Sequence, residues 1–198
     1  EVLQRGAQAD PVLLQESLQD IEREVVRLTR LVADLLALAR ADAGVHLERR
    51  PVELEPLLLE VFREARQLAR GVEVRLGSED QVQVLGDADR LKQLLLNLVD
   101  NALKYTSPGG TVTLSLYREG PWACLAVADT GIGIPASEQG RIFERFYRGQ
   151  GAGRRGGMGL GLSIARWVAE EHGGQITVQS AEGQGSTFVV WLPLTADD

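Results

Sequence analysis

The chain has 198 residues, 44% of them hydrophobic and 25% charged, which is typical of a globular protein and excludes a disordered one. Its formal net charge of -7, without a basic stripe, argues against nucleic-acid binding. No apolar run approaches the roughly 18–20 residues that span a bilayer, no signal peptide opens the chain, and the single cysteine, Cys124, cannot form an internal disulfide.

The first predicted element is one long helix over residues 10–40. Asp10 is a favourable N-cap, and Pro11 suits the first helical position. The apolar positions then step alternately by four and three residues; they are Leu14, Leu18, Ile21, Val25, Leu28, Val32 and Leu35. A helix packed on its own domain is one explanation, but this sustained 3.5-residue repeat favours a helical bundle. Its partner helices are expected outside this sequence, as in a piece of a longer protein.

A linker is expected next, followed by alternating helices and strands. Residues 41–53 lose the periodicity, contain a Gly and a Pro, and lead into a short first strand; His46 lies among them. Helices are predicted over 55–69, 89–105 and 162–171, and strands over 72–76, 82–85, 111–117, 122–128, 175–180 and 186–192. Turns at 119–121 and 182–185 join the last four strands into two hairpins. The pattern predicts an α+β fold, a two-layer sandwich whose mixed sheet is covered on one face by helices.

The helix over 89–105 carries polar residues along one arc and leucines on the other. At about 100° per residue, this arc contains Arg90, Gln93, Asn97, Asp100, Asn101 and Lys104. A solvated face would usually contain Glu and Lys, whereas asparagine is a mediocre helix former. Asparagine oxygens suit Mg²⁺, and a lysine one turn further along can meet a phosphate as a point charge. The arc therefore favours a binding site.

Two glycine-containing segments follow. Asp129 ends an apolar strand and precedes glycines that let a ligand approach the backbone, so its carboxylate can accept a hydrogen bond from an exocyclic amine. A simple turn explains this segment equally well. Residues 149–161 contain seven glycines in thirteen positions, with Arg148, Arg154 and Arg155 nearby, and run into a helix start. A flexible linker is one reading; backbone amides at the helix start favour an anion-binding lid.

Four short blocks in this order resemble a known family. They are residues 97–105, 129–133, 143–148 and 157–162, which match the N, G1, F and G2 boxes of bacterial sensor histidine kinases. Residues 51–194 resemble the catalytic and ATP-binding domain of that family, part of the GHKL superfamily shared with DNA gyrase, MutL and the ATP-dependent heat-shock chaperone. The resemblance implies the Bergerat ATP-binding fold, with ATP and Mg²⁺ as cofactors.

The resemblance also implies residue roles. Asn101 would coordinate magnesium with support from Asn97, while Lys104 and Arg148 would contact phosphate. These four are the expected catalytic residues. Asp129 would read the adenine amino group. The other residues expected to line the nucleotide site are Tyr105, Gly131, Gly133, Ile134, Gly157, Gly159, Leu160, Gly161 and Leu162.

By the same resemblance, residues 1–43 are the C-terminal part of the helical dimerisation and histidine phosphotransfer domain, 44–50 a linker, and 195–198 a tail. The phosphoacceptor histidine would lie upstream of residue 1, so this piece alone would not autophosphorylate. His172 matches a recurrent structural position. The implied partners are a response regulator and a second copy, in the cytoplasmic portion of a membrane-bound sensor kinase whose membrane segments lie upstream; no nucleic-acid partner is expected.

The identity of residue 97, an asparagine, distinguishes a kinase from an ATPase among the possible activities. Gyrase-like ATPases carry a glutamate there that activates water, and an amide cannot accept a proton at neutral pH. Asp100 is an acidic neighbour that could partly replace this base, but its position about 60° from Asn97 around the helix argues against that role. We therefore expect a histidine kinase that relays phosphate to a response-regulator aspartate. A GHKL-type ATPase, a non-catalytic nucleotide-binding module and a serine kinase of the anti-sigma type are the alternatives.

Overall fold

The computed structural model describes residues 14, 15, 17, 18, 21, 25, 48–149 and 158–195. The chain forms two compact units, Glu1–Gly44 and Val45–Asp198, which we describe separately. All six described residues of the first unit are helical, as the heptad pattern predicts, and Leu18, Ile21 and Val25 are exposed. The remainder of the predicted helix, His46 and the linker up to residue 47 lie outside the described residues.

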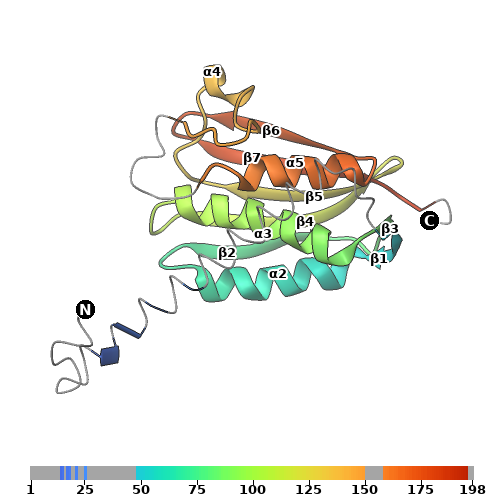
Figure 1. Ribbon diagram of the computed structural model, residues 1–198, viewed down its shortest axis with the longest axis horizontal. Helices are drawn as coiled ribbons and strands as arrows, with labels where there is room; N and C mark the ends of the chain where they lie inside the picture. Colours follow the sequence, from blue (N-terminus) through green and yellow to red (C-terminus); the bar gives the residue numbers. More distant parts are fainter. Residues whose placement is uncertain are drawn as a thin grey trace. The chain divides into compact units, whose positions relative to one another are not determined.

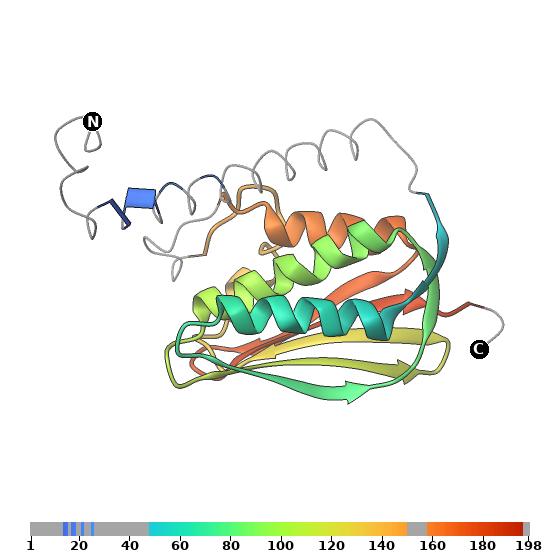
Figure 2. The same cartoon turned by 90° about the horizontal axis from the view of Figure 1, so that it is seen from below.

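The second unit has a mixed five-stranded sheet with helices along one face (Figures 1 and 2). The strand order is β2-β4-β5-β7-β6, in which β2 and β4 are parallel and the other neighbours are antiparallel. These strands are β2 (Glu73–Glu79), β4 (Thr111–Glu119), β5 (Trp122–Asp129), β6 (Gln175–Ala181) and β7 (Gly185–Pro193). The predicted α+β architecture is confirmed.

Three helices form the second layer: α2 (Leu54–Leu68), α3 (Ala88–Tyr105) and α5 (Gly161–Glu171). In α3 the leucine side is buried and the polar arc is more exposed, as the sequence pattern predicts. Asp87 caps α3, because its carboxylate accepts a hydrogen bond from the Arg90 N–H at 3.1 Å. Lys92 joins α3 to α2 through ion pairs with Glu60 and Glu64.

Two strand predictions need correction. The strand predicted over 72–76 continues through Glu79, where a register irregularity alters its pairing with β4. The segment predicted over 82–85 becomes β3 (Gln83–Gly86), which pairs with β1 (Arg50–Glu53) in a separate two-stranded sheet and forms one isolated bridge, between Val84 and Leu194. Residues 77–79 (Gly-Ser-Glu) lack the apolar alternation that would have predicted the extension. The short helix α4 (Ala136–Gln139) has no buried residue, so hydrophobic periodicity could not predict it.

The central strand β5 is buried along most of its length. Leu125 and Val127 point toward the helices, opposite Val190 and Phe188 of β7. Cys124 lies on the other face of the sheet between its cross-strand neighbours Tyr117 and Trp191, and is nevertheless fully buried. Burial raises the pKa of this thiol to about 11.

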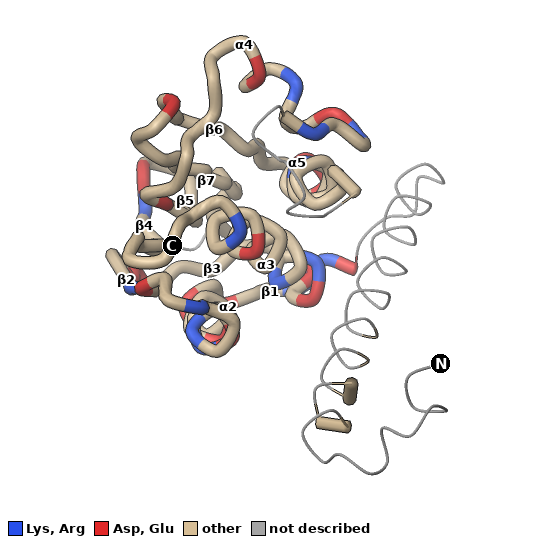
Figure 3. Tube along the Cα trace, turned by 90° about the vertical axis from the view of Figure 1, so that its left-hand side faces the viewer, with Lys and Arg blue, Asp and Glu red and all other residues tan. Residues whose placement is uncertain are grey.

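Surface charge is mixed in sign. Figure 3 shows acidic and basic residues interspersed along the described part of the second unit, without a continuous basic stripe. No helix among the described residues is both long and apolar enough to cross a membrane.

His172 connects the C-terminal end of α5 to the N-terminal end of α3. Its ring is buried; Nδ1 lies 2.7 Å from the Val168 carbonyl oxygen, and Nε2 accepts the Asp87 N–H at 3.0 Å. This pair of contacts requires a neutral imidazole protonated on Nδ1. Arg49 donates a hydrogen bond to the Glu171 carbonyl at the end of the same helix. The predicted structural role of His172 therefore has a specific form, a bridge between two helices.

This bridge predicts a stability that depends on pH. Burial lowers the pKa of His172 below its ordinary value of 6.5, so the unfolded chain takes up the proton first. Stability should therefore fall as pH drops below about 6.5, by at most about 1.4 kcal/mol per pH unit from this residue. Chemical denaturation at several pH values would measure the slope. In His172→Gln, whose amide oxygen can still accept the Asp87 N–H, that part of the slope should disappear; an unchanged slope would contradict the assignment.

Candidate nucleotide site

Asn97 and Asn101 lie one turn apart on α3, and Asn97 lies close to the start of α5. A Cβ at Gly161, the first residue of α5, would lie 3.7 Å from the Asn97 side chain. The Nδ2 atom of Asn97 is buried and has no hydrogen-bond partner among the described residues. A buried amide left without a partner costs free energy unless a ligand satisfies it. Asn97 therefore offers a buried hydrogen-bond donor that a ligand could satisfy.

Asp129 stands at the end of β5, half-buried. Its carboxylate accepts the Gly131 N–H at 2.8 Å and a backbone hydrogen bond from Ser186 of β7. Burial raises the pKa of Asp129, and these two hydrogen bonds oppose that shift. A carboxylate has about four acceptor positions, so this group can still accept a hydrogen bond from a ligand amine.

The turn after Asp129 packs directly against the end of α3. Ile132 donates its N–H to the Tyr105 carbonyl oxygen at 3.3 Å. A Cβ at Gly131 would lie 2.5 Å from that same oxygen, which no side chain could tolerate without movement. The fold therefore brings the carboxylate of Asp129 to the helix that carries the asparagine pair, and Gly131 permits the close approach.

The predicted glycine positions further along are also tightly enclosed. Gly133 has φ of +69°, and a Cβ there would lie only 1.9 Å from the Ala181 carbonyl oxygen. Ile134 follows it and donates its N–H to the Ser180 hydroxyl at 2.8 Å. The segment after Asp129 is thus fixed on one side by α3 and on the other by the β6–β7 hairpin.

The F and G2 segments are hydrogen-bonded to each other. Phe146 donates its N–H to the Gly159 carbonyl at 3.0 Å, and Gly159 has φ of +72°. Phe146 itself has φ of +64°, unusual for a bulky residue, and the residue is 63% exposed. Leu160 is buried at the start of α5, and Leu162 is half-buried in its first turn. Gly157 lies outside the described residues, as do residues 150–156, while Arg148 is exposed.

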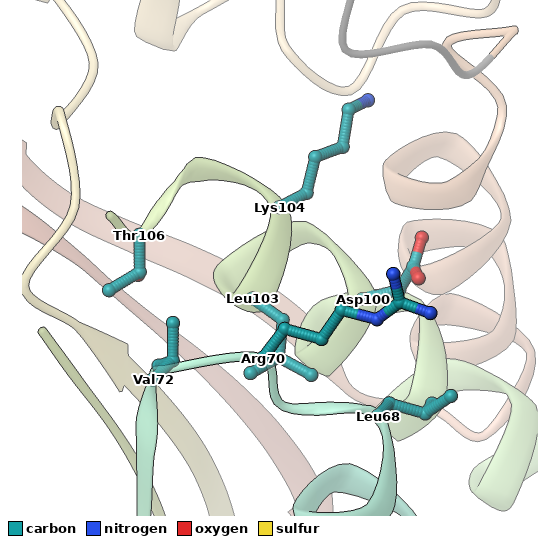
Figure 4. Close-up of a pocket in the computed structure, with 7 residues that line it drawn as sticks. All are labelled: Leu68, Arg70, Val72, Asp100, Leu103, Lys104 and Thr106. Carbon is teal, nitrogen blue, oxygen red and sulfur yellow. The ribbon is translucent and has the colours of Figure 1, made fainter. Parts of the chain in front are cut away.

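Lys104 lies two turns after Asn97, about 20° from it around the axis of α3. Its ammonium group is 4.8 Å from the ring centre of Tyr105. It borders a pocket of about 300 Å³ that faces the end of α2 and the start of β2 (Figure 4). The lining residues are Leu68, Arg70, Val72, Asp100, Leu103, Lys104 and Thr106. In Figure 4 the Lys104 side chain extends away from Leu68 and Val72. Asp100 also borders this pocket.

The close approach at Gly131 leads to a prediction. In Gly131→Ala the new Cβ would meet the Tyr105 carbonyl at 2.5 Å, so the turn and Asp129 must shift. We expect nucleotide affinity to fall by about tenfold or more, with a loss of roughly 1–3 kcal/mol of stability. Nucleotide titration and thermal unfolding would measure both. Gly140→Ala is the matched control, since a Cβ at Gly140 meets nothing within 4 Å and its φ is -67°. Equal effects of the two substitutions would contradict this account.

Three polar residues that hold the turn after Asp129, one on α4 and two on the β6–β7 hairpin, have no recognisable signal in the sequence. Ser180, Ser186 and Gln139 all make hydrogen bonds to or around this turn. The only sequence signal near them was the hairpin glycines, which predicted a turn and no ligand contact.

Comparison with known proteins connects this geometry to a family. The family model described as "Histidine kinase-, DNA gyrase B-, and HSP90-like ATPase" matches residues 86–196. The chain is 40% identical over 188 residues to the probable sensor histidine kinase TcrY of Mycobacterium tuberculosis, covering 93% of this chain and 39% of that protein. It is 39% identical over 189 residues to the signal transduction histidine-protein kinase BaeS of Escherichia coli, covering 92% of this chain and 40% of that protein.

Solved structures agree with the sequence relatives. The mycobacterial sensor histidine kinase MprB superposes with a TM-score of 0.68 and 34% identity, over 73% of this chain and 98% of that one. Full-length ShkA in complex with AMPPNP gives a TM-score of 0.77 and 32% identity, over 91% of this chain and 39% of that one. The chain spans between 23% and 48% of the length of the curated relatives that it matches.

Proposed function

Because this chain belongs to the family of histidine kinase-, DNA gyrase B- and HSP90-like ATPases, and contains the ATP-binding domain of a sensor histidine kinase, we propose that it binds Mg-ATP for transfer of the γ-phosphoryl group to a histidine. The observation that carries this proposal is the junction of Asp129 with α3. The half-buried carboxylate of Asp129 accepts the Gly131 N–H, and the next residue, Ile132, donates its N–H to Tyr105 at the end of the helix that carries the two asparagines and the lysine.

Asp129 would accept a hydrogen bond from the adenine amino group. Charge-assisted bonds of this kind contribute more when water is excluded, which fits the burial that raises the pKa of this carboxyl. The glycines at 131 and 133 let the base approach the backbone. Tyr105, Ile134, Leu160 and Leu162 would border the nucleotide.

Asn101, with Asn97 beside it, would hold Mg²⁺, whose preferred ligands are oxygen atoms such as these amide oxygens. The ion would neutralise negative charge on the phosphates. Lys104 and Arg148 would add positive charge from two sides and orient the terminal phosphoryl group. The glycine segment at 157, 159 and 161 would cover the phosphates with backbone N–H groups at the start of α5.

Asn97 favours transfer to a histidine over transfer to water. A side-chain amide cannot remove a proton from water, so the site lacks a base at this position. In the transfer, an imidazole nitrogen forms a bond to the γ-phosphorus while the bond to the bridging oxygen of ADP breaks. The acceptor histidine, dimerisation through a helical hairpin that includes residues 1–43, and relay to a response-regulator aspartate are parts of the same proposal for the whole protein.

The test separates a kinase module from an ATPase. The chain is incubated with γ-labelled Mg-ATP after binding has been confirmed in the same buffer, and free phosphate and protein-bound label are followed. We expect binding with almost no phosphate release and no label on this chain. Label should appear on a separately supplied phosphotransfer helix of the family. Steady phosphate release that is lost in Asp129→Asn would instead assign the chain to the ATPases, and acid-labile label on the chain would identify His46 or His172 as an acceptor.

A further inference from the structure

Ser180, near the end of β6, uses every hydrogen-bonding position of its hydroxyl group. Its Oγ accepts the Ile134 N–H at 2.8 Å, donates to the Gly185 carbonyl at 2.8 Å, and lies 2.9 Å from the Ser186 hydroxyl. A serine hydroxyl has one donor and two acceptor positions, so all three are occupied when Ser186 donates. This side chain is half-buried and joins two segments that are far apart in sequence.

Both segments, the turn that contains Ile134 and the start of β7, fix the position of Asp129. Ile134 closes the turn whose Gly131 N–H donates to the Asp129 carboxylate. On the other side, the Ser186 backbone N–H bonds the same carboxylate. Gly185 packs so closely on the Asp129 backbone that a Cβ there would lie 1.9 Å from the Asp129 carbonyl oxygen. The hydroxyl of Ser180 is therefore the shared support of the two donors to this carboxylate.

Neighbouring contacts strengthen the same connection. Gly183, in the hairpin turn, donates its N–H to the Ile132 carbonyl at 2.7 Å. Gln139 donates its side-chain amide to the carbonyl oxygens of Ile134 and Ser180, each at 2.9 Å. The tip of the β6–β7 hairpin and the turn after Asp129 thus form one hydrogen-bonded unit, with Ser180 at its centre.

We propose that Ser180 is a positioning residue for adenine recognition, which fixes the turn so that the Asp129 carboxylate meets the exocyclic amine of the base. The inference rests on the proposed function and goes further, because it assigns selectivity for a 6-aminopurine to a hairpin residue that does not contact the nucleotide. Without this hydroxyl, the Ile134 N–H and Gly185 carbonyl lose their partner, and both donors to Asp129 lose their support. The carboxylate then samples orientations that do not match the amine.

The test compares two nucleotides that differ at the 6-position. Calorimetry measures the affinities of the full chain for Mg-ATP and for Mg-ITP. The base of ITP carries a carbonyl group where adenine carries the 6-amino group. The wild-type chain should prefer ATP. In Ser180→Ala, ATP affinity should fall about fivefold to tenfold while ITP affinity stays nearly constant, so that the preference collapses. Ser180→Thr retains the hydroxyl and should keep most of the preference.

A matched control comes from the same strand. Thr177 lies on β6, and its hydroxyl accepts a hydrogen bond from the Trp191 indole, away from Asp129. Thr177→Val should leave the ratio of affinities unchanged. If Ser180→Ala weakens the binding of ATP and ITP equally, or weakens the binding of neither nucleotide, the hydroxyl has no part in selectivity. Either result would overturn the inference. A wild-type chain that binds neither nucleotide would overturn the proposed function itself, which is a distinct result.

Discussion

Asp129→Asn is expected to lower the affinity for ATP by about tenfold to one hundredfold, while the folded domain stays intact. The substitution replaces a charged acceptor by an amide that can turn a donor toward the adenine amine, and a charge-assisted hydrogen bond contributes about 1.5–3 kcal/mol. Calorimetric titration with Mg-ATP would measure the loss.

The free energy of unfolding of Asp129→Asn should not fall along with its ATP affinity. Burial raises the pKa of Asp129, so the folded protein holds the ionised carboxylate less favourably than the unfolded chain does. At neutral pH, removing this charge should leave the free energy of unfolding unchanged or slightly higher. As pH falls toward the raised pKa, wild-type ATP affinity should also decline, because the protonated carboxyl is a poorer acceptor.

Asp100→Asn is the control for the charge change. Asp100 is exposed and faces the pocket on the α2 side of α3. Its substitution should preserve ATP affinity and should not change phosphate release. If Asp129→Asn binds ATP as tightly as the wild-type chain does, the carboxylate does not read the base, and the proposed orientation of the nucleotide is wrong.

Asn101→Ala is expected to abolish most of the gain in ATP affinity that magnesium provides. The substitution removes an amide oxygen from the polar arc of α3, and the loss of a metal-coordinating group should cost at least about tenfold in metal-dependent affinity. Titrations with ATP in the presence of Mg²⁺ and of a chelator would measure the difference.

The titration in chelator is the internal control for this second prediction. Without the metal, Asn101→Ala and the wild-type chain should bind ATP with similar, weak affinity, since adenine recognition by Asp129 is unaffected. A variant that keeps the full effect of magnesium would remove Asn101 from the metal site. A variant that loses affinity equally in both buffers would instead indicate damage to α3.

Local patterns predicted the helices of the second unit, and the buried side of α3, well. The 3.6-residue period placed Leu91, Leu94 and Leu98 in the core and left Asn97 and Asn101 on the other side, because helix geometry converts spacing directly into direction. The same reasoning placed Asp129 at a strand end. Sequence could not predict that the turn after Asp129 closes on Tyr105, since that contact depends on the pairing of β4 with β5.

The sequence did not predict the pairing of β3 or the roles of Ser180 and Gln139, because both depend on contacts between segments far apart in the chain. The segment 83–86 has a strand-like composition, but its partner β1 precedes a whole helix, and no local pattern selects that partner over the main sheet. Ser180 and Gln139 are ordinary polar residues in sequence. Their importance arises only when the hairpin folds back on the Asp129 turn, so that side-chain hydroxyl and amide groups satisfy backbone atoms elsewhere.

The burial of Cys124 provides the chain with an internal reporter of folding. This thiol is the only cysteine and lies fully enclosed in the central strand, where its raised pKa also suppresses the reactive thiolate. A thiol-specific reagent can therefore modify it only when β5 separates from its neighbours. The labelling rate at a given pH would measure how often the sheet opens. Its decrease on adding nucleotide would measure how much a ligand bound at the end of β5 stabilises the middle of that strand.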